Sequence, residues 1–180
     1  MKKLLMILPL VILLCFTFGC QQDEEGITEE EAKAIHDLYV EARNTVNLDL
    51  LDEIYAKDVV VHDSGYPEEL VGLDALKEYY SNNHKAFPDL HITFDEMIVK
   101  GDRIIVLWTF SGTNTGPLHT PLGEIPATGR KVQFSGVAID RVDEGKIVED
   151  WVYWNVLDIL QQVGFTLNPP QPPEPPEEKK

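Results

Sequence analysis

Hydrophobic residues in the first part of the chain recur every three or four positions, which is the spacing of one helix face. This spacing predicts a helix over residues 28–46, and Thr28 with Glu31 forms a capping-box pattern at its start. The same spacing predicts a shorter helix over residues 48–55 and a third over about residues 74–86. The first half of the domain is therefore expected to be mainly helical.

Alternating hydrophobic and polar residues follow in the second part, and this period of two is typical of β-strands. Strands are predicted over residues 90–100, 103–116, 131–143 and 147–155, with a short earlier strand over residues 59–63. Helices followed by a run of strands predict an α+β domain. We expect a cone-shaped, strongly curved antiparallel sheet that packs on the N-terminal helices and leaves a cavity between the two layers.

The two ends of the chain differ from this domain in composition. Residues 1–19 combine a basic start with a long apolar run, which is typical of a secretory signal peptide. The Cys20 that follows resembles the lipidated cysteine of bacterial lipoproteins, so we expect an exported protein that a lipid anchors to the bacterial cell envelope. An ordinary signal peptide with an incidental cysteine is the alternative. Residues 20–27 are predicted to be a polar tether, residues 28–165 the domain, and residues 166–180 a proline-rich, acidic, disordered tail.

Charge and cysteine content narrow the possible functions. The chain has 31 acidic and 15 basic residues, which give a formal net charge of −16. This excess argues against nucleic acid as a partner and against electrostatic attraction to anionic lipid. Both cysteines, Cys15 and Cys20, belong to the predicted signal and its end, so the folded domain has no thiol. Cysteine catalysis, disulfides and thiolate metal sites are therefore excluded from the domain.

Four segments of the predicted domain together follow a family pattern. They are His62-Asp63, residues 86–116, residues 125–151 and residues 160–164. In these segments the chain resembles the SnoaL-like polyketide cyclase or ester cyclase family, within the nuclear-transport-factor-two-like superfamily. The resemblance implies an apolar cone-shaped pocket and ring closure by an intramolecular aldol reaction, in which an acidic residue moves protons without cofactor or metal. The superfamily also includes non-enzymatic binders.

The strand over residues 147–155 holds the main candidate residues. Its alternation places Asp150, Val152 and Trp154 on one face and Glu149 on the other. The family resemblance implies a catalytic aspartate at the position of Val152, and valine cannot transfer a proton. Asp150 lies two residues earlier on the same face, where an apolar pocket would raise its pKa and suit it to acid–base catalysis. A solvated aspartate near a strand edge is the alternative.

Four further side chains are candidates for the pocket. His62 ends the first strand, where it is predicted to orient a carbonyl group or to assist proton transfer, and a rim histidine bonded to the backbone or to Asp63 is the alternative. His84 and Tyr80 lie on the third predicted helix and are expected to face the pocket, although a partly exposed His84 is the alternative. Trp108 is expected in the pocket wall or the aromatic core.

Other catalytic classes lack their sequence patterns. The chain has no H-x-x-x-H, H-E-x-x-H or G-x-S-x-G spacing, so we expect no metal site and no serine nucleophile. The hypothesis is a protein that binds a small apolar carbonyl compound and uses Asp150, assisted by His62, for cofactor-free ring closure, isomerisation or dehydration. A non-catalytic ligand-binding lipoprotein and a module that forms homodimers through its sheet are the alternatives.

Overall fold

The computed structural model describes residues 26–121 and 123–168 of the 180-residue chain. The predicted signal peptide, Cys20 and residues 169–180 of the predicted tail lie outside the described residues. Within the described ranges, no helix has the length and apolar character needed to cross a membrane.

The helices lie where the hydrophobic spacing predicts them. At the start of α2 (Glu29–Thr45), the Thr28 hydroxyl accepts a hydrogen bond from the Glu31 N–H at 3.2 Å, and the Glu31 carboxylate accepts one from the Thr28 N–H at 3.0 Å. This is the predicted capping box, which satisfies N–H groups that a helix start leaves free. The other helices are η1 (Leu48–Leu50), α3 (Leu51–Ile54), α4 (Leu73–Ala86) and α5 (Val156–Gln162).

The main sheet has six strands in the spatial order β2-β1-β8-β7-β4-β3. Its strands are β1 (Tyr55–Asp63), β2 (Leu70–Val71), β3 (His91–Lys100), β4 (Arg103–Thr113), β7 (Lys131–Asp143) and β8 (Lys146–Trp154). A separate small hairpin joins β5 (Leu118–Thr120) and β6 (Gly123–Ile125). The predicted α+β class and helix-backed sheet are confirmed. The sheet is nevertheless mixed rather than antiparallel throughout, because β1 runs parallel to β8. A parallel pair needs a long connection, and the intervening elements from β2 to β7 supply it.

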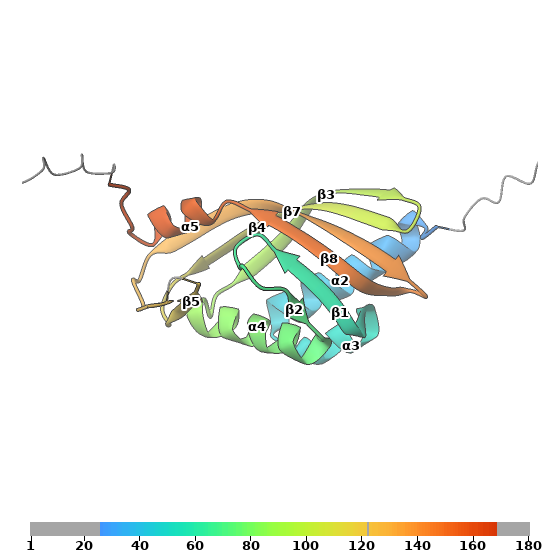
Figure 1. Ribbon diagram of the computed structural model, residues 1–180, viewed down its shortest axis with the longest axis horizontal. Coiled ribbons are helices and arrows are strands. Elements are labelled where there is room, and N and C mark those ends of the chain that lie inside the picture. Colours follow the sequence, from blue (N-terminus) through green and yellow to red (C-terminus); the bar gives the residue numbers. More distant parts are fainter. Residues whose placement is uncertain (1–25, 122, 169–180) are drawn as a thin grey trace, which may run out of the picture.

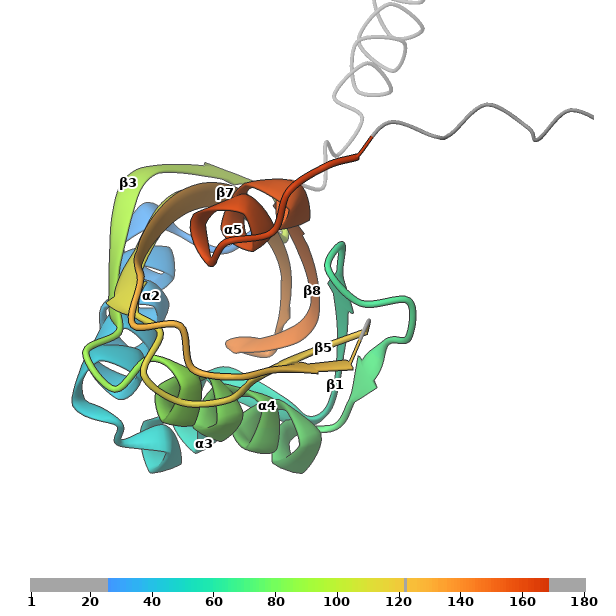
Figure 2. The same cartoon turned by 90° about the vertical axis from the view of Figure 1, so that its left-hand side faces the viewer.

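The sheet curls around a central space that α2 and α4 border on the other side (Figures 1 and 2). Register shifts leave one extra residue on β3 between Phe94 and Glu96 and one on β8 between Ile147 and Glu149, and such bulges bend and twist strands. Gly136 of β7 permits a close approach of the Trp108 side chain from β4, since a Cβ at this glycine would lie 2.3 Å from the indole Cζ2. Large side chains such as Trp108, Phe110 and Phe134 line the inner face of the curled sheet. Helix α5 and strand β5 lie near one end of the curl (Figure 2).

The hydrophobic core is divided into two clusters. One lies among α2, α3, α4 and the sheet, with Leu51, Val59 and Leu76 among its buried residues. The other is rich in aromatic side chains and includes Phe87, Phe110, Phe134 and Ile159. Residues of both clusters border the cavity that forms the candidate site.

Candidate functional site

A cavity of about 120 Å³ lies inside the cone, between the inner face of the sheet and helices α2 and α4. Its volume is comparable to the ~150 Å³ apolar cavity that admits benzene, so its enclosed part suits a single ring. The wall is largely aromatic and includes Trp108, Phe110 and Phe134. Tyr66 and His119, which are only partly buried or exposed, mark the open end, where the Tyr66 hydroxyl donates to the His119 carbonyl at 3.0 Å.

Two aspartates form the polar part of the sheet wall. Asp150 of β8 and Asp140 of β7 are direct partners in the antiparallel register, so their side chains share the inner face. They are only 3% and 2% exposed. Burial raises the pKa of Asp140 to about 7, and burial together with the charge and hydrogen bond of Asp140 raises the pKa of Asp150 well above its usual range. At neutral pH the pair therefore keeps a proton that the two carboxyls share, because adjacent buried carboxyls cannot both ionise.

His36 of α2 approaches this pair from the helix side. Its Nε2 lies 3.1 Å from the Asp140 Oδ2, without the angle of a hydrogen bond. Burial lowers the pKa of His36 to about 4, although the charges of Asp150 and Asp37 oppose the shift. The imidazole is therefore neutral at neutral pH, and the contact is not an ion pair. Although one histidine and two carboxyls meet here, the described part of the chain has no cluster of three or more such side chains arranged to hold a metal ion.

Asp63 at the end of β1 is a third carboxyl in the cavity wall. Its oxygens accept hydrogen bonds from the Trp154 Nε1 at 2.7 Å, the Gly65 N–H at 2.8 Å and the Tyr79 hydroxyl at 3.1 Å. Burial raises the pKa of Asp63, and these three donors oppose that shift because they stabilise the charged form. The parallel register places Asp63 beside Val152. Its three partners fix it in place, so it orients the wall around Trp154.

Comparison with known proteins agrees with this geometry. The sequence profile of the SnoaL-like polyketide cyclases matches residues 33–163. The chain belongs to this family. TsrD from Streptomyces laurentii has the same fold, with a TM-score of 0.69, 23% identity, and coverage of 77% of this chain and 98% of that chain. AclR from Streptomyces galilaeus is similar, with a TM-score of 0.65, 26% identity and coverage of 76% and 98%.

A more distant likeness identifies the broader fold. A protein with a ketosteroid isomerase-like fold from Catenulispora acidiphila, solved with trimethylamine, has a TM-score of 0.61 and 17% identity, and 75% of this chain and 97% of that chain are covered. No curated protein matches the sequence. The comparisons therefore establish the SnoaL-like family and its ketosteroid isomerase-like fold, and the chemistry has to be argued from the site itself.

Five of the residues predicted from the sequence lie in the wall of this SnoaL-like cavity. They are Asp150, Tyr80, Trp108, Val152 and Trp154. Strand alternation placed the three residues of β8 on the inner face, and helical spacing placed the tyrosine. Sequence reasoning did not identify the partners of Asp150, because the register that joins β7 to β8 is a tertiary feature.

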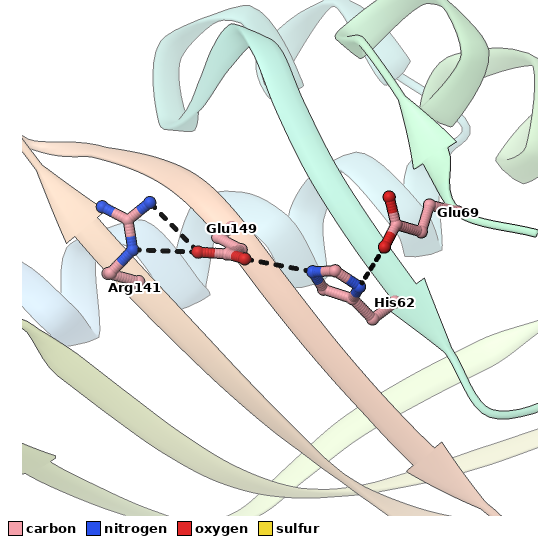
Figure 3. A network of polar contacts seen from close by, with 4 residues as sticks. All are labelled: His62, Glu69, Arg141 and Glu149. Atoms are coloured by element: carbon pink, nitrogen blue, oxygen red, sulfur yellow. Dashed lines mark hydrogen bonds and ion pairs between the residues drawn. The ribbon is translucent and has the colours of Figure 1, made fainter.

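The prediction that His62 faces the pocket is corrected by the structure. His62 lies on the outer face of the sheet, where its Nε2 is 3.1 Å from Glu149 and its Nδ1 is 3.2 Å from Glu69 (Figure 3). Glu149 in turn pairs with Arg141 at 3.1 Å, and the His62 ring stacks on Trp151 with centroids 5.2 Å apart. The physical reason is strand alternation, since the next residue along β1 turns inward instead. His62 therefore cannot assist Asp150.

The structure also corrects the prediction that His84 faces the pocket. This α4 residue is 8% exposed but is not among the residues that line the cavity, whereas its neighbours Asn83 and Tyr80 are. Burial, reinforced by the positive charge of Arg43, lowers the pKa of His84 to about 4. His84 is thus a neutral, buried histidine behind the SnoaL-like cavity.

Proposed function

We propose that this SnoaL-like protein binds a small, largely apolar carbonyl compound and moves protons on it at the Asp140–Asp150 pair, without a cofactor. The observation that carries the proposal is a buried, proton-sharing carboxyl pair in the wall of a mostly aromatic cavity. A general acid or base works best when its pKa lies near the working pH, and the Asp140 pKa of about 7 meets this condition.

The pair can supply the base of an enolisation and later return the proton. The ionised Asp140 carboxylate, or the Asp150 oxygen once its proton has moved, takes a proton from the carbon next to a carbonyl. The pair then holds two protons, and the substrate is an enolate whose oxygen carries the negative charge. Return of a proton from the pair to another carbon completes an isomerisation. Attack of the enolate carbon on a second carbonyl, whose oxygen takes the proton back from the pair, closes a ring. The family supports ring closure as the overall reaction.

Exchange of α-protons for deuterium in heavy water tests this step without knowledge of the natural substrate. We expect the wild-type protein to accelerate exchange on single-ring ketones and cyclic 1,3-dicarbonyl compounds, as NMR would show. The rate should change most steeply around the Asp140 pKa of about 7, because the pair changes its proton content there. Exchange no faster than in buffer across the set would reject the enzymatic proposal and leave a ligand-binding protein as the alternative.

We further propose that the protein is exported and anchored to the cell envelope through a lipid on Cys20. The basic and apolar segment over residues 1–19 supports export, and the cysteine directly after it supports lipidation. The net charge of −16 supports a small-molecule partner over nucleic acid.

We also propose that two copies of the chain form a homodimer, and the apolar outer face of the sheet supports this proposal. The register aligns Ile98, Ile105, Ile139 and Trp151 in one row across four strands. The adjacent row contains Leu107, Val137 and Tyr153. Ile98, Leu107 and Tyr153 are 48%, 37% and 53% exposed. Contiguous exposed apolar side chains of this kind mark interaction surfaces, and the same patch on two copies can pair about a two-fold axis.

Sedimentation analysis tests this homodimer. We expect the domain to be dimeric at micromolar concentration and Leu107→Glu to make it monomeric, because each copy would bury an unpaired charge. Val71→Glu is the matched control: Val71 is 62% exposed on the edge strand β2, away from the two rows. A monomeric wild-type domain, or equal effects of the two substitutions, would rule out this interface.

A further inference from the structure

Arg43 of α2 is a buried cation in the cavity wall that has no acidic partner among the described residues. It is 3% exposed, and none of the ion pairs in the described ranges includes it. A guanidinium stays charged in proteins, and a buried charge without a counter-charge is costly. Its Nε is buried without a hydrogen-bond partner. The Tyr80 ring compensates in part, since its centroid lies 3.7 Å from the guanidinium carbon.

A chain of hydrogen bonds leads from this cation into the cavity. The Arg43 Nη1 donates to the Tyr39 hydroxyl at 2.8 Å, and the Tyr39 hydroxyl donates to the Tyr80 hydroxyl at 3.3 Å. Within the described part of the chain, no group accepts the remaining Tyr80 proton. Because each donor in a chain polarises the next, the charge of Arg43 strengthens Tyr80 as a donor. A ligand in the cavity therefore meets a phenol whose proton is available. Burial raises the pKa of Tyr80 well above its usual range, and the charge of Arg43 opposes this rise.

The donor chain and the carboxyl pair face the same cavity from different layers. Arg43 and Tyr39 belong to α2 and Tyr80 to α4, whereas Asp140 and Asp150 belong to the sheet. Tyr80 and Asp150 line the same cavity of about 120 Å³, and the charge of Asp150 is among the causes that raise the pKa of Tyr80. A carbonyl compound held between the layers would have its oxygen on the helix side and its α-carbon at the carboxyl pair.

We propose that the Tyr80 hydroxyl, supported by Tyr39 and Arg43, is an oxyanion site that binds the enolate oxygen of a single-ring 1,3-dicarbonyl or phenol-like compound. The proposal rests on the proposed proton transfer for its choice of substrate class, but the anion site itself is a binding property. The ligand oxygen supplies the counter-charge that Arg43 lacks. Preorganised donors in a site that excludes water are the usual means of stabilising such an oxyanion.

Binding of 4-nitrophenol to the full chain tests the oxyanion site directly. This probe has one ring, and its neutral and anionic forms differ in visible absorbance. We expect the wild-type protein to bind the anion about tenfold more tightly than the neutral phenol, so that the bound probe ionises about one pH unit lower than the free probe. Tyr80→Phe removes the donor and keeps the ring, and should abolish this preference. Tyr39→Phe should reduce it, because the link to Arg43 is broken.

Two control variants distinguish the oxyanion site from an effect of any tyrosine substitution and from the proposed proton transfer. Tyr153→Phe, on the outer face, should retain the preference for the anion. Asp150→Asn should also retain it, because the residue is not a donor in the chain, although the variant should lose α-proton exchange. In the wild-type protein, an anion preference without α-proton exchange would reject only the proposed proton transfer, and exchange without an anion preference would reject only the oxyanion site. No binding of 4-nitrophenol at millimolar concentration, binding as the neutral form, or an unchanged preference in Tyr80→Phe would overturn the oxyanion site.

Discussion

The Asp150→Asn variant is expected to lose α-proton exchange and, at about pH 8, to be more stable than the wild-type protein. Removal of a general acid or base lowers a rate by about 10²–10⁴-fold, and asparagine keeps the shape of aspartate without its titrating proton. The gain in stability should be about 1–3 kcal/mol, because the wild-type fold must keep a buried carboxyl pair that high pH forces to ionise. Urea unfolding at several pH values measures the second effect.

The direction of the stability change follows from the pKa shifts. Burial raises the folded-state pKa of Asp150 well above its ordinary value, and that of Asp140 to about 7. The folded state therefore holds more protons than the unfolded chain. The stability contribution is fully present below the unfolded pKa of about 4 and is lost as pH rises through the folded value, at about 1.4 kcal/mol per pH unit for one carboxyl. Wild-type stability should thus fall as pH rises from about 4, through the Asp140 value of about 7 and on towards the higher folded value of Asp150, and this fall should be smaller in Asp150→Asn.

Two buried histidines change the stability with pH in the direction opposite to the carboxyl pair, and they do so over a different pH range. His36 and His84 have pKa values lowered to about 4 by burial, so the stability they contribute is present above about 6.5 and is lost as pH falls towards 4. The titration of these two histidines therefore does not affect a comparison of stabilities above pH 7. Asp143→Asn, on an exposed position of β7, is the matched control and should follow the wild type. A wild-type stability that rises from about pH 7 to 9, or a less stable Asp150→Asn, would contradict the assignment.

Local periodicity was sufficient to predict most of this fold and one wall of the site. Alternation along β8 separates Asp150 from Glu149, and the structure places them on opposite faces. The same rule, applied to Val59, Val61 and Asp63, would have placed Asp63 rather than His62 inside. His36, Tyr39 and Arg43 of α2 have the spacing of one helix face. The sequence alone could therefore have predicted that these three polar side chains face the cavity together.

The pairing of strands could not be predicted in the same way. Asp140 meets Asp150 only because β7 and β8 pair in one register with a bulge at Val148 of β8, opposite Arg141 and Val142. One residue of slip would turn either aspartate to the outer face, and the sequence does not mark where the bulge falls. The parallel contact between β1 and β8 likewise depends on how the sheet closes, since these strands lie far apart along the chain. The sequence could therefore predict single candidate residues such as Asp150, but it could not predict that Asp140 and Asp150 form a pair.

Asn114→Ala is expected to destabilise the domain by roughly 2–5 kcal/mol, the largest loss that we expect from removing one neutral side chain. Asn114 is fully buried at the end of β4, with 0% exposed. Its Nδ2 donates to the Gly116 carbonyl at 2.8 Å, and its Oδ1 accepts from the N–H and the hydroxyl of Thr128, each at 2.9 Å. Alanine would leave these groups without partners, and unsatisfied buried polar groups cost about 1–3 kcal/mol each.

The control for this loss is Asn47→Ala, since Asn47 is exposed and its side chain makes no capping hydrogen bond. It should change stability by no more than about 0.5 kcal/mol. Asn114 does not titrate, so the destabilisation of Asn114→Ala should be the same at about pH 7 and 9, unlike the effect of Asp150→Asn. Equal stability of Asn114→Ala and wild type would mean that the segment joining β4 to β7 is held by its backbone contacts alone. A loss that grows with pH would mean that this segment and the carboxyl pair are coupled, and that the mouth of the cavity influences its acid–base site.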